Sequence, residues 1–381
     1  MKKAWIPVGA LLMLVLAVLG TVDLVSSRAS TPATTTETVS HGQHDSSAVL
    51  ATQPEKDATD FIRFGLREAP LKTAGAIRLA TYNAENLFDA IDDPDLSGRN
   101  EDIDDAKPEA ELQGLADAIH GLDADILVLE EVESKAVLTW FRDTYLSDMG
   151  YTEIASVDAG DARGIEQSVL SRYPIVSVTN WPGKLLGGIH PEKWGSQKNW
   201  NAGEPIAFHR SPLRVVVKIP TGAAKPYLLT LFAVHFKSGR YGDYWREAES
   251  RGLVEILNDT LAKDPAANIV VLGDFNAQIS DKSVRELLDA GFVDAFGAED
   301  LSTSATKTHE SGRRIDLILV NDNLKAEIVP RSAFVLGTPA LPEGMDWHDP
   351  WRPAGYASDH FPVAVDIDPH EIQPIDQKDA S

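Results

Sequence analysis

The sequence contains no cysteine, and it carries far fewer basic than acidic residues. Without cysteine there are no disulfides, no thiolate zinc sites and no cysteine nucleophile, so any bound metal must be held by oxygen atoms and imidazole nitrogens. The 35 Lys and Arg against 58 Asp and Glu leave a formal net charge of −23, which argues against binding of nucleic acid through a broad basic surface. This balance still allows an enzyme that meets phosphate through bound cations.

Residues 1–29 have the pattern of an export segment. Lys2 and Lys3 precede an apolar run over residues 5–22, and small residues follow it. The run of about 18 residues is longer than most signal-peptide cores and long enough to span a bilayer, so an uncleaved membrane anchor is the alternative to a cleaved signal peptide. The sequence therefore predicts an extracytoplasmic protein that is secreted or periplasmic, or anchored in the membrane through residues 5–22.

Composition divides the rest of the chain into a linker, one domain and a tail. Residues 30–60 are rich in Thr, Ser and Ala and poor in large apolar side chains, so we expect a low-complexity linker in which His41 and His44 are solvated and bind no metal. One domain is expected over residues 61–370, followed by a flexible tail over residues 371–381.

Strand-like and helix-like patterns alternate through this domain. The spacing of apolar residues predicts helices within 112–122 and 245–257. Because the runs at 213–219 and 227–236 are joined by a short turn, the sheets should be mixed, and we expect an α/β layered domain. Strands are predicted at residues 77–82, 126–129, 168–170, 213–219, 227–236, 268–272, 315–320 and 361–367.

Polar and ionisable residues follow apolar runs abruptly at six places. The segments are LATYNAENLF, ILVLEEVES, LFAVHFKSG, VVLGDFNA, RRIDLILV and GYASDHFPVAV. One Asp or Asn after a strand is ordinarily a turn residue. Six such segments, however, collect carboxylates, carboxamides and imidazoles at strand ends, where α/β proteins form their sites. A shared site for metal and phosphate is the better account.

In these segments the chain resembles the endonuclease/exonuclease/phosphatase superfamily, whose members include pancreatic deoxyribonuclease, abasic-site endonucleases, inositol-polyphosphate phosphatases and bacterial sphingomyelinases. The likeness extends from Ile77 to Ile367, with all six segments in family order. It implies an α/β four-layer sandwich, in which two mixed β-sheets pack face to face, helices flank them on the outside and the active site lies at one edge.

The resemblance implies a metal site. Asn83, Glu131 and Asp359 match the family residues that hold the metal and the phosphate, and Glu130 stands where the family usually carries glutamine. Oxygen ligands of this kind suit Mg²⁺, with Mn²⁺ or Ca²⁺ as alternatives.

The resemblance also implies catalytic groups. Asp274 and Asn276 match the pair that activates the attacking water and contacts phosphate. His360 matches the phosphate-contacting histidine, and Asp316 would accept a hydrogen bond from its ring and raise its pKa.

Four further residues complete the expected site. His235 resembles the second histidine of the deoxyribonuclease-type members, and Glu166 would be its carboxylate partner, with a surface salt bridge as the alternative role for Glu166. Arg210 and Lys237 are the basic residues that we expect nearest to the phosphate of the substrate.

The implied activity is metal-assisted attack of water on a phosphodiester. YNAENLFD together with HFKSG is most similar to the bacterial extracellular nuclease branch, which agrees with the export pattern. We therefore expect a secreted, weakly sequence-selective nuclease acting on DNA, RNA or both, as a monomer without a protein partner. The alternatives are an extracytoplasmic phosphatase or phospholipase-type phosphodiesterase, and a non-catalytic surface-binding module.

Two accessory segments allow two interpretations each. Residues 89–111 contain ten acidic and two basic residues, as in a solvated loop or a structural Ca²⁺ site. Residues 181–210 interleave Trp with Lys and His, as in a loop that grips a nucleic-acid strand or one that its own tryptophans hold down.

Overall fold

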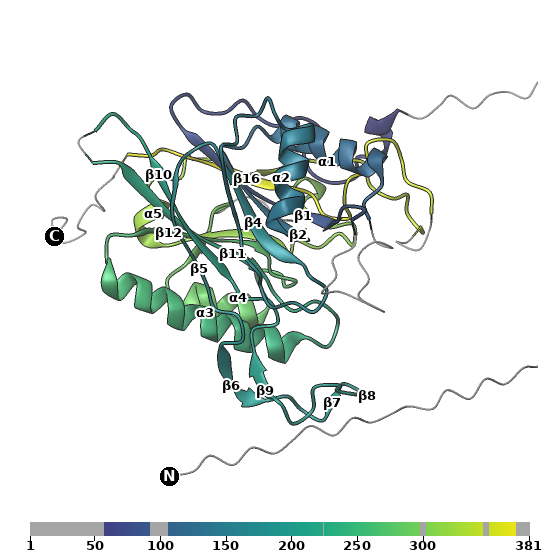
Figure 1. Ribbon diagram of the computed structural model, residues 1–381, viewed down its shortest axis with the longest axis vertical. Coiled ribbons are helices and arrows are strands. Elements are labelled where there is room, and N and C mark those ends of the chain that lie inside the picture. The colour runs from purple at the N-terminus through teal and green to yellow at the C-terminus, as the bar shows by residue number, and fades with distance from the viewer. Residues whose placement is uncertain (1–56, 92–105, 224, 298–301, 346–349, 371–381) are drawn as a thin grey trace, which may run out of the picture. The chain divides into compact units, whose positions relative to one another are not determined.

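The computed structural model describes residues 57–91, 106–223, 225–297, 302–345 and 350–370 (Figure 1). Contacts divide the chain into Met1–Gln53 and Pro54–Ser381, and every described residue belongs to the second unit. The expected export segment, nearly all of the linker, the tail after residue 370 and most of the acidic segment therefore lie outside the described residues. Within the described ranges, no helix is long and apolar enough to cross a membrane.

Two six-stranded sheets form the centre of the domain. The first has the strand order β15-β16-β1-β2-β4-β3 and the second the order β13-β14-β12-β11-β10-β5. Both are mixed, because β1 pairs in parallel with β2 and antiparallel with β16, while β11 pairs in parallel with β12 and antiparallel with β10. The first sheet consists of β1 (Ile77–Leu87), β2 (Ile126–Val132), β3 (Glu153–Ser156), β4 (Glu166–Ser171), β15 (Phe334–Val335) and β16 (Val363–Ile367). The second consists of β5 (Ile175–Asn180), β10 (Leu213–Ile219), β11 (Tyr227–His235), β12 (Asn268–Asp274), β13 (Val293–Asp294) and β14 (Asp316–Val320).

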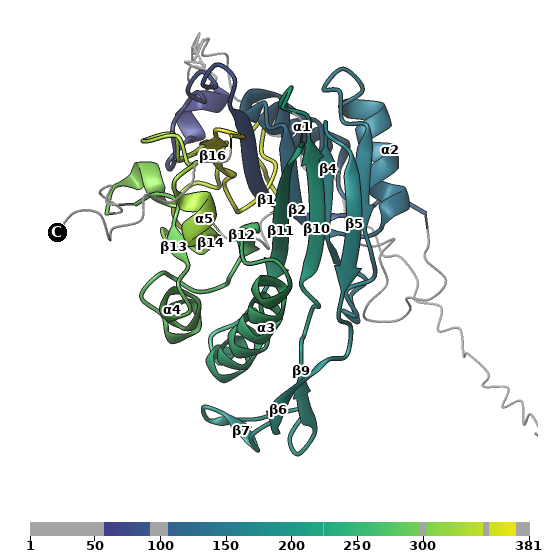
Figure 2. The same ribbon diagram turned by 90° about the vertical axis from the view of Figure 1, so that its left-hand side faces the viewer.

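Helices cover the outer faces of both sheets (Figure 2). The described helices are η1 (Ala58–Phe61), α1 (Glu109–Leu122), α2 (Lys135–Tyr145), α3 (Asp243–Lys263), α4 (Lys282–Asp289), η4 (Ser304–Thr306) and α5 (Asp322–Lys325). Helices α1 and α2 pack on the first sheet and α3 and α4 on the second. Ser134 caps α2 by accepting a hydrogen bond from the amide of Val137 at 3.2 Å, which fixes where that helix begins.

Alternation along each strand builds three apolar layers. Leu79 and Val128 from the first sheet meet Val215 and Leu272 from the second in the core between the sheets. The strand residues of opposite parity point outward, toward the helices. The expected four-layer sandwich of two mixed sheets and flanking helices is thus confirmed.

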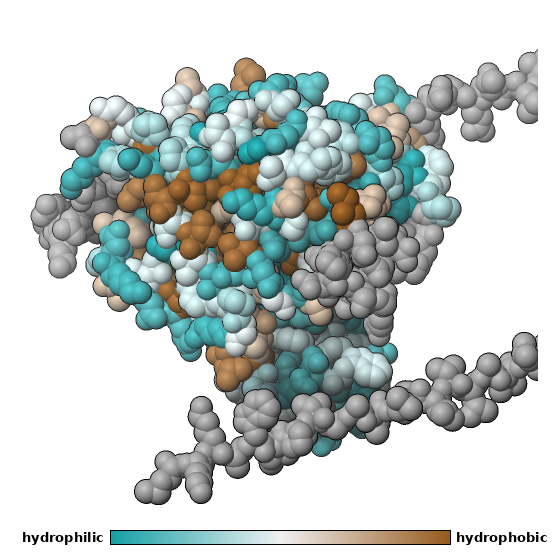
Figure 3. Space-filling model, viewed as in Figure 1, coloured by the Kyte–Doolittle hydropathy of each residue, from teal (hydrophilic) through white to brown (hydrophobic). Residues whose placement is uncertain are grey.

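One edge strand leaves apolar side chains uncovered. Val176 and Val178 of β5 are 53% and 39% exposed. Figure 3 shows apolar side chains gathered in a band across this face of the molecule. β5 borders the second sheet, so one of its sides has no partner strand in the described part of the chain.

The segment over residues 181–210 forms two small hairpins beside α3. They are β6 (Leu185–Ile189) with β9 (Pro205–Ala207), and β7 (Lys193–Trp194) with β8 (Gln197–Lys198). The ring of Trp181 stacks on Phe232, and Nε1 of Trp194 donates to the hydroxyl of Tyr244 at 2.9 Å. Trp200 remains 83% exposed. Two tryptophans therefore hold the segment down, while the third faces solvent.

Candidate active site

Residues from both sheets meet at one edge of the sandwich. In the parallel pair β1 and β2, Asn83 lies opposite Glu130, and in the parallel pair β11 and β12, His235 lies opposite Asp274. Asp274 is also opposite Asp316 of β14. A hydrogen bond of 3.2 Å from Nδ2 of Asn83 to Oδ2 of Asp274 joins the two sheets. The ends of these strands thus form one site.

The loop after β12 holds Asp274 in place. Oδ1 of Asp274 accepts a hydrogen bond from the amide of Asn276 at 2.7 Å, and Oδ2 accepts one from its Nδ2 at 3.0 Å. Asn276 has a φ of 49°, a conformation that asparagine tolerates better than most residues. Burial raises the pKa of Asp274 to about 6, although the charge of His360 opposes the shift. Asp274 can therefore exchange a proton with water near neutral pH.

His360 lies among three carboxylates. Its Nδ1 is 3.0 Å from both carboxylate oxygens of Asp316, and its Nε2 is 3.9 Å from Oδ2 of Asp274 and 3.8 Å from Oδ1 of Asp359. Burial opposes the protonation of His360, but the three negative charges outweigh burial and raise its pKa well above the ordinary value. The ring is therefore a cation that can donate to phosphate from Nε2, and the expected hydrogen bond to Asp316 is present.

His235 has different neighbours from those that the sequence suggested. Its Nε2 lies 3.5 Å from Oδ2 of Asp274 and 3.7 Å from Oε1 of Glu131. Burial, with a contribution from the charge of Arg210, lowers its pKa well below the ordinary value, so the ring is neutral. Nδ1 is buried and has no hydrogen-bond partner in the described part of the chain.

The expected pairing of Glu166 with His235 is wrong. The Glu166 carboxylate instead accepts a hydrogen bond from the hydroxyl of Ser156, and no salt bridge of Glu166 is found among the described residues. The two side chains do not meet because they lie on different faces of their sheets. In β4, Glu166 has the parity of Leu170, which packs against the helices, whereas His235 has the parity of Ala233, which faces the core between the sheets.

Gln167 of β4 faces the core between the sheets. It shares its face with Val169 and is 1% exposed. Both atoms of its amide lack a hydrogen-bond partner within the described ranges, as does Nδ1 of His235. On β4, the inward side chain is therefore the neutral amide of Gln167, and not the carboxylate of Glu166 that the sequence predicts there.

The two adjacent acids of β2 have different environments. Glu130 is fully buried and accepts a hydrogen bond from Thr81 at 2.7 Å, and burial raises its pKa well above the ordinary value, which favours the protonated form. Glu131 has a φ of 60°, and the pairing of β2 with β4 shifts register between Leu129 and Val132. This bulge turns Glu131 toward His235, a direction that strict alternation would not give it.

Gly273 leaves room where the two sheets meet. A Cβ atom at this position would lie 2.0 Å from the carbonyl oxygen of Val234 and 2.9 Å from Oε1 of Glu130, and its φ of 137° is unfavourable for other residues. The glycine before Asp274 is therefore a steric requirement of the site.

Three residues of the site were not expected from the sequence. Oε2 of Glu85 accepts hydrogen bonds from the Tyr356 hydroxyl at 2.9 Å and from the amide of Asp359 at 3.0 Å, and Nζ of Lys107 donates to the Glu85 carbonyl at 3.0 Å. Burial, then the charge of Asp359, raises the pKa of Glu85 to about 7. Glu85 lies in the same LATYNAENLF segment as Asn83, and this was the feature of the sequence from which its place in the site could have been inferred.

His309 is a fourth unexpected residue and it holds Asp359. Its Nδ1 accepts a hydrogen bond from the amide of Ser311 at 2.9 Å and lies 2.8 Å from its hydroxyl, while Nε of Arg313 donates to that hydroxyl oxygen at 3.0 Å. Nδ1 is thus an acceptor, so the ring proton is on Nε2, which lies 3.2 Å from Oδ2 of Asp359. This chain of contacts fixes the orientation of Asp359.

The two basic residues expected near phosphate are largely engaged by protein groups. Arg210 is buried and forms an ion pair of 2.5 Å with Asp161. Nζ of Lys237 donates to the carbonyl of Ser238 at 3.0 Å, and burial followed by the charge of Arg210 lowers the pKa of Lys237. Both charges lie near the end of β11, where His235 is.

The donors at this edge suit a hard divalent cation. In the described part of the chain, two groups have ligand atoms within 4.8 Å of one another: His309, Asp359 and His360, and Asp274, Asp316 and His360. Glu131 belongs to neither group, and the amide oxygen of Asn83 accepts from the amide of Glu85 at 3.0 Å. The residues expected to bind metal thus lie at one edge without forming a single closed cluster. Buried, mutually repelling carboxylates are the donor set that Mg²⁺ or a similar ion neutralises.

Several solved structures are similar to this chain at low sequence identity. A protein titled endonuclease/exonuclease/phosphatase from Beutenbergia cavernae DSM 12333 matches with a TM-score of 0.50 and 17% identity over 77% of this chain and 71% of that one. The human Nocturnin catalytic domain matches with a TM-score of 0.47 and 15% identity, over 78% of this chain and 95% of that one. Truncated TDP2 of Caenorhabditis elegans matches with a TM-score of 0.48 and 16% identity, over 77% of this chain and 97% of that one. No curated protein matches the sequence.

The sequence also matches a family model. The match covers residues 80–360, from the middle of β1 to His360, and so includes every strand-end residue described above. It spans well over half of the chain. The protein therefore belongs to the endonuclease/exonuclease/phosphatase family, whose members are hydrolases that act on phosphate ester bonds.

Proposed function

We propose that the protein is an extracytoplasmic, divalent-metal-dependent nuclease that hydrolyses DNA, RNA or both with little sequence selectivity. The observation that carries the proposal is the arrangement of Asn83, Asp274, Asp316 and His360 from both sheets around one edge. Support for export comes from the pattern of residues 1–29. Support for a nuclease comes from the YNAENLFD and HFKSG segments.

In this proposal Asp274 acts on the attacking water. Asn276 and Asn83 hold its carboxylate by hydrogen bonds, and its raised pKa suits it to orient the water and accept its proton. The water oxygen bonds to phosphorus as the ester bond to the leaving oxygen breaks. The leaving oxygen takes up a proton from bulk water, and Asp274 releases the proton that it accepted to bulk water.

His360 stabilises the charge that develops on the phosphoryl oxygens. Asp316 holds the ring at Nδ1 and keeps it cationic, so Nε2 can donate to a phosphoryl oxygen. A divalent cation held by Glu131 and Asp359 would supply further positive charge to the same oxygens. Mg²⁺ is the ion that this oxygen set suits best, with Mn²⁺ or Ca²⁺ as alternatives.

The test is hydrolysis by the purified chain of plasmid DNA, single-stranded DNA, RNA, sphingomyelin and inositol phosphates, each with Mg²⁺, with Mn²⁺ and with EDTA. We expect cleavage of the nucleic acids, loss of activity with EDTA and a fall in kcat of about 100-fold or more in His360→Ala. The matched control is His120→Ala, which removes a partly exposed histidine of α1 outside the site.

Other outcomes would contradict the proposal. Cleavage of sphingomyelin or inositol phosphates in preference to polynucleotides would assign the site to the phosphodiesterase or phosphatase alternative. Full activity after exhaustive chelation would exclude the metal. A folded chain that hydrolyses none of the five substrates would favour a non-catalytic binding module.

A further inference from the structure

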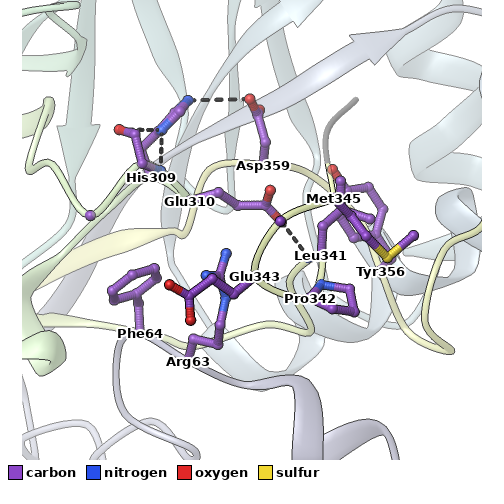
Figure 4. Close-up of a pocket in the computed structure, with 13 residues that line it drawn as sticks. Arg63, Phe64, His309, Glu310, Leu341, Pro342, Glu343, Met345, Tyr356 and Asp359 are labelled. Atoms are coloured by element: carbon purple, nitrogen blue, oxygen red, sulfur yellow. Dashed lines mark hydrogen bonds and ion pairs between the residues drawn. The ribbon is translucent and has the colours of Figure 1, made fainter. Parts of the chain in front are cut away.

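A cavity of about 510 Å³ opens beside Asp359 (Figure 4). Its volume is in the range of small-ligand sites. Phe64 and Arg63 line one side, and Leu341, Pro342 and Tyr356 contribute further surface. Because Asp359 lies in its wall, a ligand in the cavity would be adjacent to the group that we assign to the metal and the phosphate.

One wall of the cavity joins an aromatic ring to a guanidinium. The guanidinium carbon of Arg63 lies 5.2 Å from the centroid of the Phe64 ring, and both residues line the cavity. An aromatic ring and a guanidinium side by side are surfaces on which a flat group can stack. Phe64 is itself held by Phe361, with ring centroids 5.7 Å apart.

The remaining polar groups of the cavity are acidic or already bonded. Glu310 accepts a hydrogen bond from the amide of Leu341 at 2.6 Å, and His309 contacts Asp359. Glu310, Glu343 and Asp359 give the wall more negative than positive charge, so a second phosphate would be repelled. A neutral, flat group with hydrogen-bond acceptors fits this set better. Nucleobases are such groups, and proteins bind them by stacking on aromatic rings and on arginine.

We propose that this cavity binds the base of the nucleotide next to the scissile phosphate, with the base against the ring of Phe64 and the guanidinium of Arg63. The assignment rests on the proposed nuclease function, because that function places the scissile phosphate at Asp359 and His360. It names a contact that the family relationship does not supply, since Arg63 and Phe64 precede the matched residues 80–360.

The test measures binding separately from turnover. The probes are the 5′- and 3′-monophosphates of 2-aminopurine deoxyriboside, whose fluorescence falls when the base stacks, titrated with the full chain in Mg²⁺. Arg63→Lys keeps the charge but removes the flat guanidinium, and Phe64→Leu keeps an apolar side chain but removes the ring. Arg285→Lys, at an exposed position of α4, is the matched control.

We expect saturable quenching by the unmodified chain and by Arg285→Lys. Arg63→Lys and Phe64→Leu should each raise Kd by about fivefold or more, whereas Arg285→Lys should leave Kd unchanged. If Phe64→Leu fails to fold, Arg63→Lys still decides the result.

Two failures are distinguishable. Hydrolysis of bis(p-nitrophenyl) phosphate without quenching, or equal Kd values in all variants, would overturn the base site and leave the nuclease proposal intact. Displacement of the probe by phosphocholine at similar affinity would also overturn it. Absence of phosphodiester hydrolysis in every metal would overturn the proposed function itself.

Discussion

Burial raises the pKa of the Glu166 carboxyl to about 7, and the hydrogen bond from Ser156 offsets only part of the shift. The unfolded chain releases this proton near pH 4.5, so the folded state holds more protons between pH 4.5 and 7. The pKa of Glu166 is higher in the folded chain than in the unfolded chain, because burial disfavours the ionised carboxylate. The contribution of Glu166 to stability is therefore lost as the pH rises through this window.

Glu166→Gln should remove that loss. We expect its free energy of unfolding to exceed that of the unmodified chain by about 1–2 kcal/mol at pH 8 and to match it at pH 4, a smaller gain than the full shift implies because the side chain is only half-buried. Urea denaturation at the two pH values measures the difference. If the two proteins differed in free energy of unfolding by the same amount at pH 4 and at pH 8, the raised pKa of Glu166 would not be the cause. Since Glu166 does not contact His235, kcat should stay within about twofold.

A second expectation at this scale concerns His309 and the carboxylate that it holds. His309→Ala should weaken Mn²⁺ binding by about 10- to 100-fold, because partners that orient a metal-binding carboxylate commonly have effects of this size. His309→Gln keeps a side-chain N–H donor and should recover most of the affinity. Isothermal titration of Mn²⁺ into each variant, with His120→Ala as control, provides the measurement. If Gln is as weak as Ala, the ring of His309 acts as a metal ligand or by packing on His360, and not by orienting Asp359.

At the scale of the element, the close approach of β11 and β12 depends on Gly273. A methyl group there would meet the Val234 carbonyl and displace the strand that carries Asp274. Gly273→Ala should lower the free energy of unfolding by about 1–3 kcal/mol and reduce kcat as well. Gly121→Ala in α1, where the new methyl finds only an ordinary contact of 3.5 Å with Leu336, should be neutral or stabilising. Similar losses in both variants would contradict the steric argument.

The β7–β8 hairpin offers a separate test of substrate length. Trp200 and Lys198 are exposed, whereas Trp194 is bonded to Tyr244. Trp200→Ala with Lys198→Ala should raise KM for long DNA about fivefold or more, flatten its salt dependence and leave KM for bis(p-nitrophenyl) phosphate unchanged. The control, Trp194→Ala, should lower stability. Unchanged KM and salt slope would make the hairpin a structural feature only.

Elements whose pattern is local were predictable from the sequence, and those that depend on distant partners were not. The helix over 112–122 was expected because its apolar residues recur on one face, but it begins at Glu109, where Pro108 ends the preceding loop. The short strands β3 and β5 were missed because their pairing with β4 and β10 is set by the sheet.

The site shows the same division. Asn83, Asp274 and His360 follow apolar strands, so their meeting could be inferred. Glu131 points into the site because of a bulge, and Glu166 points away because β4 packs with Val169 inward. The alternation of residues along a strand predicts that neighbouring side chains lie on opposite faces, but it does not predict which face packs in the core. The directions of these two side chains could therefore not be inferred from the sequence.

For the molecule as a whole, the negative charge concentrated at one edge predicts stabilisation by divalent cations. Binding to the folded state at 100 times Kd contributes about 2.7 kcal/mol, which corresponds to a rise in Tm of about 4 °C for a domain of this size. Thermal unfolding in Mg²⁺, in NaCl of equal ionic strength and in EDTA measures the effect. An equal rise with NaCl would attribute it to screening of the net charge of −23 instead.

The hydrogen bond between Asn83 and Asp274 joins residues 191 positions apart, and Asp359 and His360 lie just before β16, the last strand of the described residues. A growing chain therefore has no complete set of catalytic groups until nearly the whole domain has left the ribosome. Sub-fragments released by premature termination or proteolysis would be inert. For a hydrolase of phosphate esters, this order of synthesis delays activity until the whole domain has been made.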